Sequence, residues 1–393
     1  MLKSYAPLQA PQRLLFGPGP GPVSPRVYQA MSQPVVGHLD PFFSQTVEDI
    51  RELLGYAFST TNGFNIAVSG TGSAGMETAV ANFAEPGRKF AVLSNGFFAD
   101  RIAEMARRQG AEVARLVKDW GEAYDPQEVR DFIRREQPRV VAFVQAETST
   151  GMYNQAKPIC DAAREVDALV IADCVTSLGG MPVMVDANGI DIAYSCSQKG
   201  LGCPPGLAPV TVSPRALERL KARTTPVQSW YLDLLLLDTY YTGRKYHHTA
   251  SATMFYALRE GLAMVAEEGL ENRWDRHRRN HQAFVAGVEA MGLQMHVQDP
   301  AQRLWTLNTP RVPQGVDDAK VRQYLLQERG IEIAGGFGPL AGKVFRIGTM
   351  GYGSSAENVL LILEALEAAM RHQGYVPAGD SRGAAEKALA ASV

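Results

Sequence analysis

Between residues 64 and 213 the sequence alternates short apolar runs with longer stretches of helical periodicity. The apolar runs cover residues 64–68, 89–93, 112–117, 139–144, 168–172, 190–195 and 207–212, and helical patterns cover 74–83, 98–109, 126–136 and 159–166. Strands that alternate with helices form βαβ units, and strands that are apolar throughout are typical of a sheet covered on both faces. The sequence therefore predicts an α/β fold with a mostly parallel, doubly wound sheet.

The pattern changes after residue 250. Helical patterns at 251–268 and 269–291 precede strand-like pieces at 303–308, 331–333 and 343–347, with further helices at 320–329 and 357–371. We therefore expect a large domain over residues 15–268 and a smaller C-terminal α+β domain over residues 269–372. Residues 1–14 are expected to form an arm. Residues 373–393, rich in Ala, Gly and Ser, are expected to form a loosely held tail that could end in a helix.

Composition excludes several classes of partner. Hydrophobic residues make up 46% of the chain and charged residues 20%, with a net charge of −2, as in a globular protein with a large core. No basic run predicts nucleic-acid binding, and no apolar stretch approaches the roughly 20 residues that span a bilayer. The N-terminal residues lack a signal core, so we expect a cytoplasmic protein without a membrane partner. The four cysteines lack the close pairing typical of a zinc site, so we expect no metal.

Residues 191–200 carry the strongest chemical signal. They predict a buried strand that ends on Lys199, followed by a glycine- and proline-rich turn at 201–206. A lysine in such a place suits an amine that attacks a carbonyl carbon and forms a Schiff base. Asp173, at the end of another apolar strand, could cap the next segment or pair with a protonated pyridine nitrogen. Pyridoxal 5'-phosphate (PLP) enzymes need both groups.

A glycine-rich turn, Ser69-Gly-Thr-Gly-Ser-Ala-Gly75, joins a predicted strand to a predicted helix. Free N–H groups at a helix N-terminus bind phosphate, and Thr71 and Ser73 add hydroxyl groups. The turn could instead be a ligand-free connection. A dinucleotide loop is disfavoured because no strand ending in Asp or Glu lies about 20 residues downstream.

Three further segments hold polar residues that need an explanation. Gln145, Glu147 and Thr148 follow a predicted strand, at the edge where ligands bind in open α/β sheets. Arg346, within an apolar strand, predicts either a structural ion pair or bidentate capture of a substrate carboxylate. In the run 246–249, Tyr-His-His-Thr, neighbouring histidines on a strand would point to opposite faces, so hydroxyl contacts to a phosphate are favoured over a metal.

Together these segments resemble class V, fold type I, PLP-dependent aminotransferases of the alanine–glyoxylate and serine–pyruvate group. The matching pieces occur in family order from residue 15 to about 370, which is nearly the whole chain. They are residues 15–20 (Leu-Phe-Gly-Pro-Gly-Pro), 69–72, 147–151, 173 with 177–180, 197–200, 204–206, 246–249, 258–260, 269–272 and 346–348.

The resemblance implies a role for each site residue. Lys199 would bind the cofactor aldehyde and move the substrate proton. The remaining cofactor contacts would be Thr71, Gly72, Ser73 and Gln198 at the phosphate, Asp173 at the ring nitrogen, Thr148 at the ring hydroxyl, and Tyr246 and Thr249 from the partner subunit of a homodimer. Arg346 would bind the substrate carboxylate, and the loop 17–22, with Gly21, would line the substrate side. Phe98 stands where animal members carry a ring-stacking tryptophan, and His38 is expected near the substrate entrance.

The sequence therefore predicts transfer of an amino group from alanine or serine to glyoxylate or pyruvate, small amino acids and 2-oxo acids being the partners. The nearest alternative is (S)-ureidoglycine–glyoxylate aminotransfer. A PLP lyase such as a cysteine desulfurase would need a mobile cysteine, for which Cys203 is the candidate. A non-catalytic relative of the fold is disfavoured because every polar cofactor contact is retained.

Overall fold

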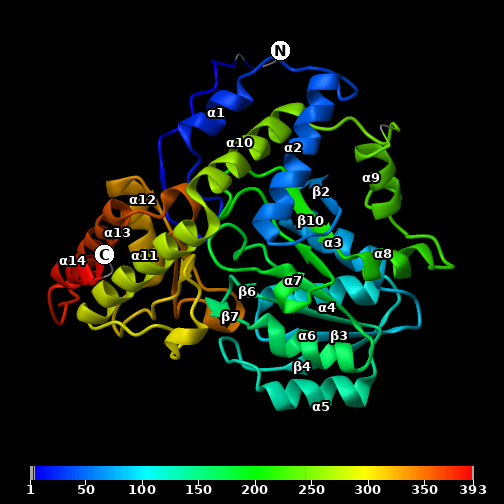
Figure 1. Cartoon of the computed structure of the whole chain (residues 1–393). Helices are drawn as coiled ribbons and strands as arrows, with labels where there is room; N and C mark the ends of the chain where they lie inside the picture. Colours follow the sequence, from blue (N-terminus) through cyan, green and yellow to red (C-terminus); the bar gives the residue numbers. More distant parts are fainter. Residues whose placement is uncertain (1–2, 4, 244, 392–393) are drawn as a thin grey trace.

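A seven-stranded sheet forms the centre of the computed structural model, which describes residues 3, 5–243 and 245–391 (Figure 1). Its strands lie in the order β2-β10-β9-β8-β5-β3-β4. They are β2 (Phe64–Ser69), β10 (Leu207–Val212), β9 (Ile192–Tyr194), β8 (Leu169–Asp173), β5 (Val140–Val144), β3 (Lys89–Ser94) and β4 (Glu112–Val117). Only β10 is antiparallel to its neighbours in this sheet. The predicted α/β fold with a mostly parallel sheet is confirmed.

Helices connect and cover these strands. They are α1 (Pro25–Met31), α2 (Pro41–Phe58), α3 (Gly72–Phe83), α4 (Phe97–Arg108), α5 (Pro126–Glu136), α6 (Ala156–Glu165), α7 (Val185–Asn188), α8 (Pro214–Lys221) and α9 (Leu234–Tyr241). The start of α5 shows how local sequence sets a boundary. Asp125 accepts hydrogen bonds from the backbone N–H groups of Gln127 and Glu128, and Pro126 takes the first helical position, where its missing N–H costs nothing.

A second apolar core lies in the C-terminal part of the chain. The helices α10 (Ala252–Glu268) and α11 (Leu270–Ala290) meet at Gly269. Beyond them, α12 (Asp318–Arg329) and α13 (Ala356–Arg371) accompany a three-stranded sheet of β11 (Leu307–Asn308), β14 (Phe345–Gly348) and β13 (Ala334–Gly335). The N-terminal strand β1 (Leu14–Leu15) pairs with β12 (Ile331–Glu332), so the start of the chain is fastened to this part. The domain boundaries at 15–268 and 269–372 stay a prediction.

Three elements differ from the sequence-based expectation. The strand β9 ends at Tyr194 and not at Lys199, although Ser195 and Ser197 still donate backbone hydrogen bonds to Pro209 and Leu207 beside it. Only Leu307–Asn308 of the predicted strand 303–308 pairs as a strand of the three-stranded sheet, because the N–H of Leu304 and the hydroxyl of Thr306 bond to loops near the edge of the central sheet instead.

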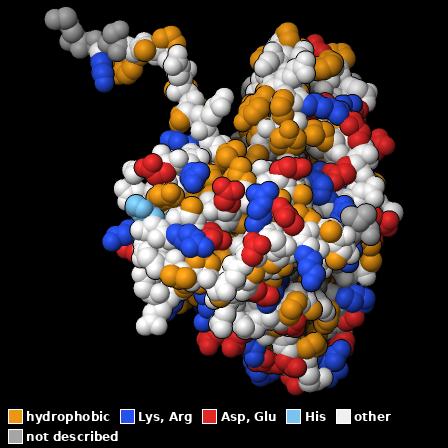
Figure 2. All heavy atoms as spheres, turned by 90° about the vertical axis from the view of Figure 1, so that its left-hand side faces the viewer, with side chains coloured by type: hydrophobic (Ala, Val, Ile, Leu, Met, Phe, Trp, Pro, Cys, Tyr) orange, Lys and Arg blue, Asp and Glu red, His pale blue; other side chains and the backbone are white. Residues whose placement is uncertain are grey.

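The C-terminal tail ends in a helix, as the sequence allowed, but its expected loose attachment is wrong for residues 381–391. They form α14 (Ser381–Ala391), in which Ser381 and Ala385 are buried, and α14 packs on α11 and α13. Small side chains on one helix face permit this close packing. By contrast, residues 5–13 are exposed, and the first described residues extend away from the body of the molecule (Figure 2). Among the described helices, none has the length and apolar character needed to cross a bilayer.

Candidate active site

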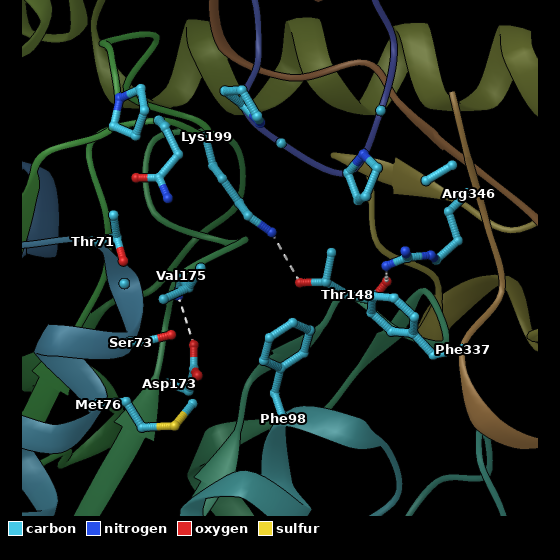
Figure 3. A pocket seen from close by; sticks show the side chains of 18 of the residues that line it. Thr71, Ser73, Met76, Phe98, Thr148, Asp173, Val175, Lys199, Phe337 and Arg346 are labelled. Carbon is cyan, nitrogen blue, oxygen red and sulfur yellow. Dashed lines mark hydrogen bonds between the residues drawn. The ribbon is translucent and has the colours of Figure 1, made fainter. Parts of the chain in front are cut away.

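A pocket of about 460 Å³ opens where β2, β5 and β8 end, between the central sheet and the C-terminal part of the chain. Strand ends of this kind are where open α/β sheets place their ligands. The pocket gathers nine of the predicted site residues, which come from six separate segments: Thr71, Gly72, Ser73, Phe98, Thr148, Asp173, Gln198, Lys199 and Arg346. Figure 3 shows most of these side chains directed toward one space.

The amine of Lys199 lies at the centre of the pocket. It donates hydrogen bonds of 3.1 Å to the hydroxyl oxygens of Thr148 and Thr176, which themselves lie 2.5 Å apart. Burial lowers the pKa of Lys199 to about 8, because a charged amine loses solvation there. The lysine is therefore still mostly charged at pH 7, but its neutral form, which attacks a carbonyl carbon, is far more populated than in an exposed lysine.

The loop 17–21 passes against this lysine. Gly19 has a φ of 121°, and a Cβ there would lie 3.0 Å from Cε of Lys199, so both the backbone and the space require glycine. Gly21 lies just outside the pocket lining, where its N–H donates to the carbonyl of Gln198. This predicted substrate residue therefore touches the backbone next to the lysine rather than the pocket itself.

Asp173 is a buried carboxylate without a cationic partner among the described residues. Its Oδ1 accepts from the N–H of Val175 at 2.9 Å and its Oδ2 from the hydroxyl of Tyr194 at 2.8 Å. Burial raises its pKa to about 6, while these two hydrogen bonds and the charge of Lys199 oppose the rise. An acid of this kind is ready to pair with a protonated ring nitrogen that enters the pocket.

The opposite wall offers donors for an anion. The helix α3 begins at Gly72, and its N-cap residue, Thr71, makes no side-chain capping bond. Its first residues, Gly72 and Ser73, line the pocket, and the helix dipole favours negative charge at this end of the helix. Gln198 lines the same pocket, and the NH₂ of its side-chain amide is a further group that can donate to an anion. A planar ring that carries a phosphate and a basic nitrogen fits this arrangement.

Phe98 and Arg101 form the adjoining wall from α4. The guanidinium carbon of Arg101 lies 4.9 Å from the centre of the Phe98 ring, and its Nη1 donates to Oγ of Ser73 at 3.0 Å. Arg101 therefore joins the ring wall to the phosphate wall. Arg101 is not among the site residues predicted from the sequence, although it lies one helical turn beyond Phe98.

Arg346 closes the side of the pocket formed by the C-terminal part. Its Nε donates to the carbonyl of Gly335 at 2.7 Å, its Nη1 donates to the carbonyl of Thr148 at 3.4 Å, and its Cζ lies 3.8 Å from the centre of the Phe337 ring. Burial lowers its pKa to about 10, so the guanidinium stays charged. The described residues provide no carboxylate partner for it, which favours substrate capture over a structural ion pair.

Tyr246 and Thr249 do not join the pocket of their own chain. The side chain of Tyr246 is 65% exposed, and Thr249 is exposed as well. The segment 246–249 is a loop and not a strand, so the two histidines do not point to opposite faces: the Nδ1 atoms of His247 and His248 lie 2.9 Å apart. His248 also bonds to Ser69, next to the phosphate wall. No cluster of three potential metal ligands occurs among the described residues.

Comparisons with known proteins agree with this geometry. The model of the family described as aminotransferase class-V matches residues 23–346. A solved alanine–glyoxylate aminotransferase from Nostoc sp. is 46% identical with a TM-score of 0.92, and the match covers 94% of this chain and 98% of that one. A ureidoglycine–glyoxylate aminotransferase from Bacillus subtilis is 42% identical with a TM-score of 0.95, over 98% and 100%. Alanine–glyoxylate aminotransferase of Mus musculus is 40% identical, over 93% and 89%.

Proposed function

Since the chain belongs to the class-V aminotransferase family and is a transaminase, we propose that it uses PLP to move an amino group from alanine or serine to glyoxylate or pyruvate. The observation that carries the proposal is the position of Lys199 and Asp173 in one pocket, each without an oppositely charged partner within hydrogen-bond distance. A ring with an aldehyde and a basic nitrogen would satisfy both groups at once.

Each wall of the pocket would hold one part of the cofactor. The phosphate would lie at the start of α3, against Thr71, Gly72 and Ser73, with Gln198 beside it. Asp173 would keep the ring nitrogen protonated, and Thr148 would bond the ring hydroxyl. Phe98 would cover one face of the ring, without the N–H that a tryptophan would add. When bound, PLP supplies an electron-poor ring that accepts the electron pair released when the Cα proton leaves.

The chain's own residues would then manage charge and protons. Lys199 is the one amine lining the pocket, and its lowered pKa allows it to take the Cα proton and return it on the neighbouring cofactor carbon. Arg346 would fix the substrate carboxylate and so decide which bond at Cα faces the ring. Thr148 and Thr176 would hold the amine in place between these steps.

The pocket shape favours small donors. Beside Arg346 the wall is formed by Leu15, Ile333, Ala334 and Phe337, which offer no cation for a second carboxylate. The remaining arginine of the lining, Arg101, is bonded to Ser73 on the cofactor side. Alanine and serine fit such a wall. (S)-Ureidoglycine is the second candidate donor, because the similar protein from Bacillus subtilis is named for it, and glyoxylate is the acceptor named for both kinds of relative.

A desulfurase reaction has less support. Cys203 is buried outside the pocket lining, its thiol bonds to the carbonyl of Ala257 at 3.3 Å, and burial raises its pKa to about 12. A buried, protonated thiol is a poor nucleophile. The similar cysteine desulfurase structure is only 13% identical, which is a likeness of fold.

We also propose a homodimer in which Tyr246 and Thr249 complete the partner's phosphate site. Both are exposed and outside their own pocket, as such a role requires. Val35, Leu39 and Phe42 are exposed apolar side chains on either side of His38, whose ring centre lies 5.3 Å from that of Tyr246, and they would be covered by the partner.

The test of the reaction is the visible absorbance of the purified protein with PLP, before and after single amino donors are added. We expect alanine or serine to discharge the cofactor band and glyoxylate to restore it. A band that only (S)-ureidoglycine discharges would select the second donor. A protein that develops no band would overturn the proposal.

The test of the shared site is subunit complementation. Lys199→Ala and Thr249→Ala subunits are mixed, after each has been shown to be inactive or weak alone. If Thr249 serves the partner, one site of the mixed dimer keeps both residues and activity returns to about a quarter to a half of wild type. Activity that equals the average of the two parents would contradict the proposal.

A further inference from the structure

The N-terminus of α4 has no cap of its own. Its N-cap residue is Gly96, which has no side chain, and the first N–H groups of the helix belong to Phe97, Phe98 and Ala99. Helix termini leave such groups unpaired, and a buried unpaired N–H is costly. Phe98 is the residue whose ring lines the cofactor pocket, so whatever satisfies these groups also sets the position of that ring.

Glu147 and Ser149 supply the cap from a different segment. The Oε2 atom of Glu147 accepts from the N–H of Phe98 at 3.1 Å and of Ala99 at 3.4 Å. The hydroxyl of Ser149 accepts from the N–H of Phe97 at 3.0 Å. The second carboxylate oxygen, Oε1, accepts from the N–H of Ser149 at 3.0 Å and from its hydroxyl at 2.6 Å. One side chain therefore joins α4 to the turn that carries Thr148.

We propose that Glu147 is a positioning residue of the transaminase site, whose buried carboxylate holds Phe98 and Thr148 in register on two walls of the cofactor pocket. The side chain is fully buried, and no lysine or arginine among the described residues forms an ion pair with it. All four of its partners are donors, so a carboxylate is the group that suits them. The proposal rests on the proposed cofactor only in that Phe98 and Thr148 would touch it.

Gly96 gives independent support, because the side chain of Glu147 occupies the space that a side chain at residue 96 would need. A Cβ atom at residue 96 would overlap Cγ and Cδ of Glu147. The φ of Gly96 is −180°, which is extended backbone open to any residue, so glycine is required there for space alone. The glycine before Phe98 and the acid before Thr148 thus form one unit, although 50 positions separate them in the chain.

The charge of Glu147 also acts on the site. Burial raises its pKa to about 7, a rise that the charge of Asp173 increases and the bonds from Ser149 oppose. It is one of the charges that raise the pKa of Lys199 and of Arg346, and it contributes to the raised pKa of Tyr124. Below about pH 7 the carboxyl takes up a proton and one of its acceptor sites is lost, so the cap weakens toward acid.

The experiment compares wild type with Glu147→Gln, which keeps the volume but turns an amide NH₂ toward N–H donors. We expect a folded apoprotein whose dissociation constant for PLP rises tenfold or more. We expect wild type to lose part of its PLP affinity as pH falls through about 7, and this part of the loss should be absent from the variant. The control is Asp191→Asn, another buried carboxylate that accepts from a backbone N–H but lies outside the pocket lining. It should be destabilised without a change in PLP affinity.

A double-mutant cycle in the apoprotein tests the geometry without any cofactor. Gly96→Ala and Glu147→Ala should each lower the urea midpoint, whereas the double variant should unfold at about the midpoint of Glu147→Ala, since the obstructing side chain is gone. Additive effects would overturn the proposed unit. Unchanged PLP affinity in Glu147→Gln would overturn the positioning role, while wild-type protein that binds no PLP would overturn the proposed function instead.

Discussion

The hydroxyl of Tyr194 donates a 2.8 Å hydrogen bond to Oδ2 of Asp173 at the buried end of the pocket. The two residues are direct partners in the register of β8 and β9, so the sheet itself brings the phenol to the carboxylate. Both side chains are almost completely buried. A hydrogen bond to an ionised acid in such a place favours the charged form and so keeps Asp173 available for a cationic ring nitrogen.

Tyr194→Phe should therefore weaken PLP binding in a pH-dependent way. Burial already raises the pKa of Asp173 to about 6, and loss of the phenol removes one of the bonds that oppose this rise. The acid must be ionised to pair with the ring, so affinity is present above its pKa and is lost as pH falls through it. We expect the acidic limb of affinity to move up by about one pH unit, equivalent to about 1.4 kcal/mol.

The measurement is the PLP dissociation constant of both proteins between pH 5 and pH 8. Tyr241→Phe is the matched control, because its buried hydroxyl donates to the carbonyl of Ala67 and does not contact the pocket acid. The control should lose stability, but its PLP affinity should fall over the same pH range as that of wild type. If PLP affinity falls at the same pH in Tyr194→Phe and in wild type, the phenol does not affect the pKa of Asp173.

Much of this site could be predicted because the fold places strand ends at one edge. Asp173, Thr148 and the turn at 69–75 all follow apolar runs, and parallel strands bring such ends together. What the pattern could not reveal is which side chains touch across that edge. Tyr194 contacts Asp173, Thr176 contacts Lys199, and Glu147 contacts the start of α4. These contacts depend on strand register and loop packing, which leave no local signal in the sequence.

The errors in the predicted elements have the same origin. Residues 303–308 have a strand-like composition, but only the last two form a strand, since tertiary bonds such as that of the Thr306 hydroxyl to the carbonyl of Thr176 fix residues 304–306 as a loop. The tail at 381–391 has the Ala content of a helix, yet only the neighbouring face of α11 makes its burial favourable. In both places long-range packing decided the outcome.

Lys199→Met should abolish transamination and stabilise the apoprotein. Burial lowers the lysine pKa from 10.5 to about 8, so at pH 7 the folded protein carries the full cost of a buried charge. Removal of that cost should add up to about 3 kcal/mol to the free energy of unfolding at pH 7. The gain should shrink as pH rises from about 8 toward 10.5, where the unfolded lysine also becomes neutral.

Urea unfolding of both apoproteins at pH 7 and pH 9.5 checks this prediction. Thr148 and Thr176 stay paired with each other in the variant, so no hydroxyl is left without a partner. A variant less stable than wild type at pH 7 would mean that burial of the charged Lys199 amine does not destabilise the folded protein. If Lys199→Met still catalysed repeated turnovers, Lys199 would not be required for the reaction.

Arg346→Ala should raise the KM for amino donors by about 10- to 100-fold, since a hydrogen bond to a charged group contributes about 1.5–3 kcal/mol. Steady-state kinetics with alanine and serine would measure it. The control is Arg215→Ala, an arginine that pairs with Asp191 at 2.9 Å and lies outside the pocket lining. An unchanged KM for both donors in the Arg346 variant would locate the carboxylate site elsewhere.

Gly19→Ala should impair the site through the lysine as well as through the backbone. The new Cβ would lie 3.0 Å from Cε of Lys199, at a φ of 121° that alanine rarely adopts. Gly87→Ala separates the two effects, because Gly87 also has a positive φ, 67°, but nothing lies within 4 Å of its Cβ. We expect both variants to lose about 1 kcal/mol of stability, whereas only Gly19→Ala slows the development of the cofactor band by tenfold or more. Stopped-flow absorbance after PLP addition measures this rate, and equal rates for the two variants would show that Gly19 serves the turn and not the lysine.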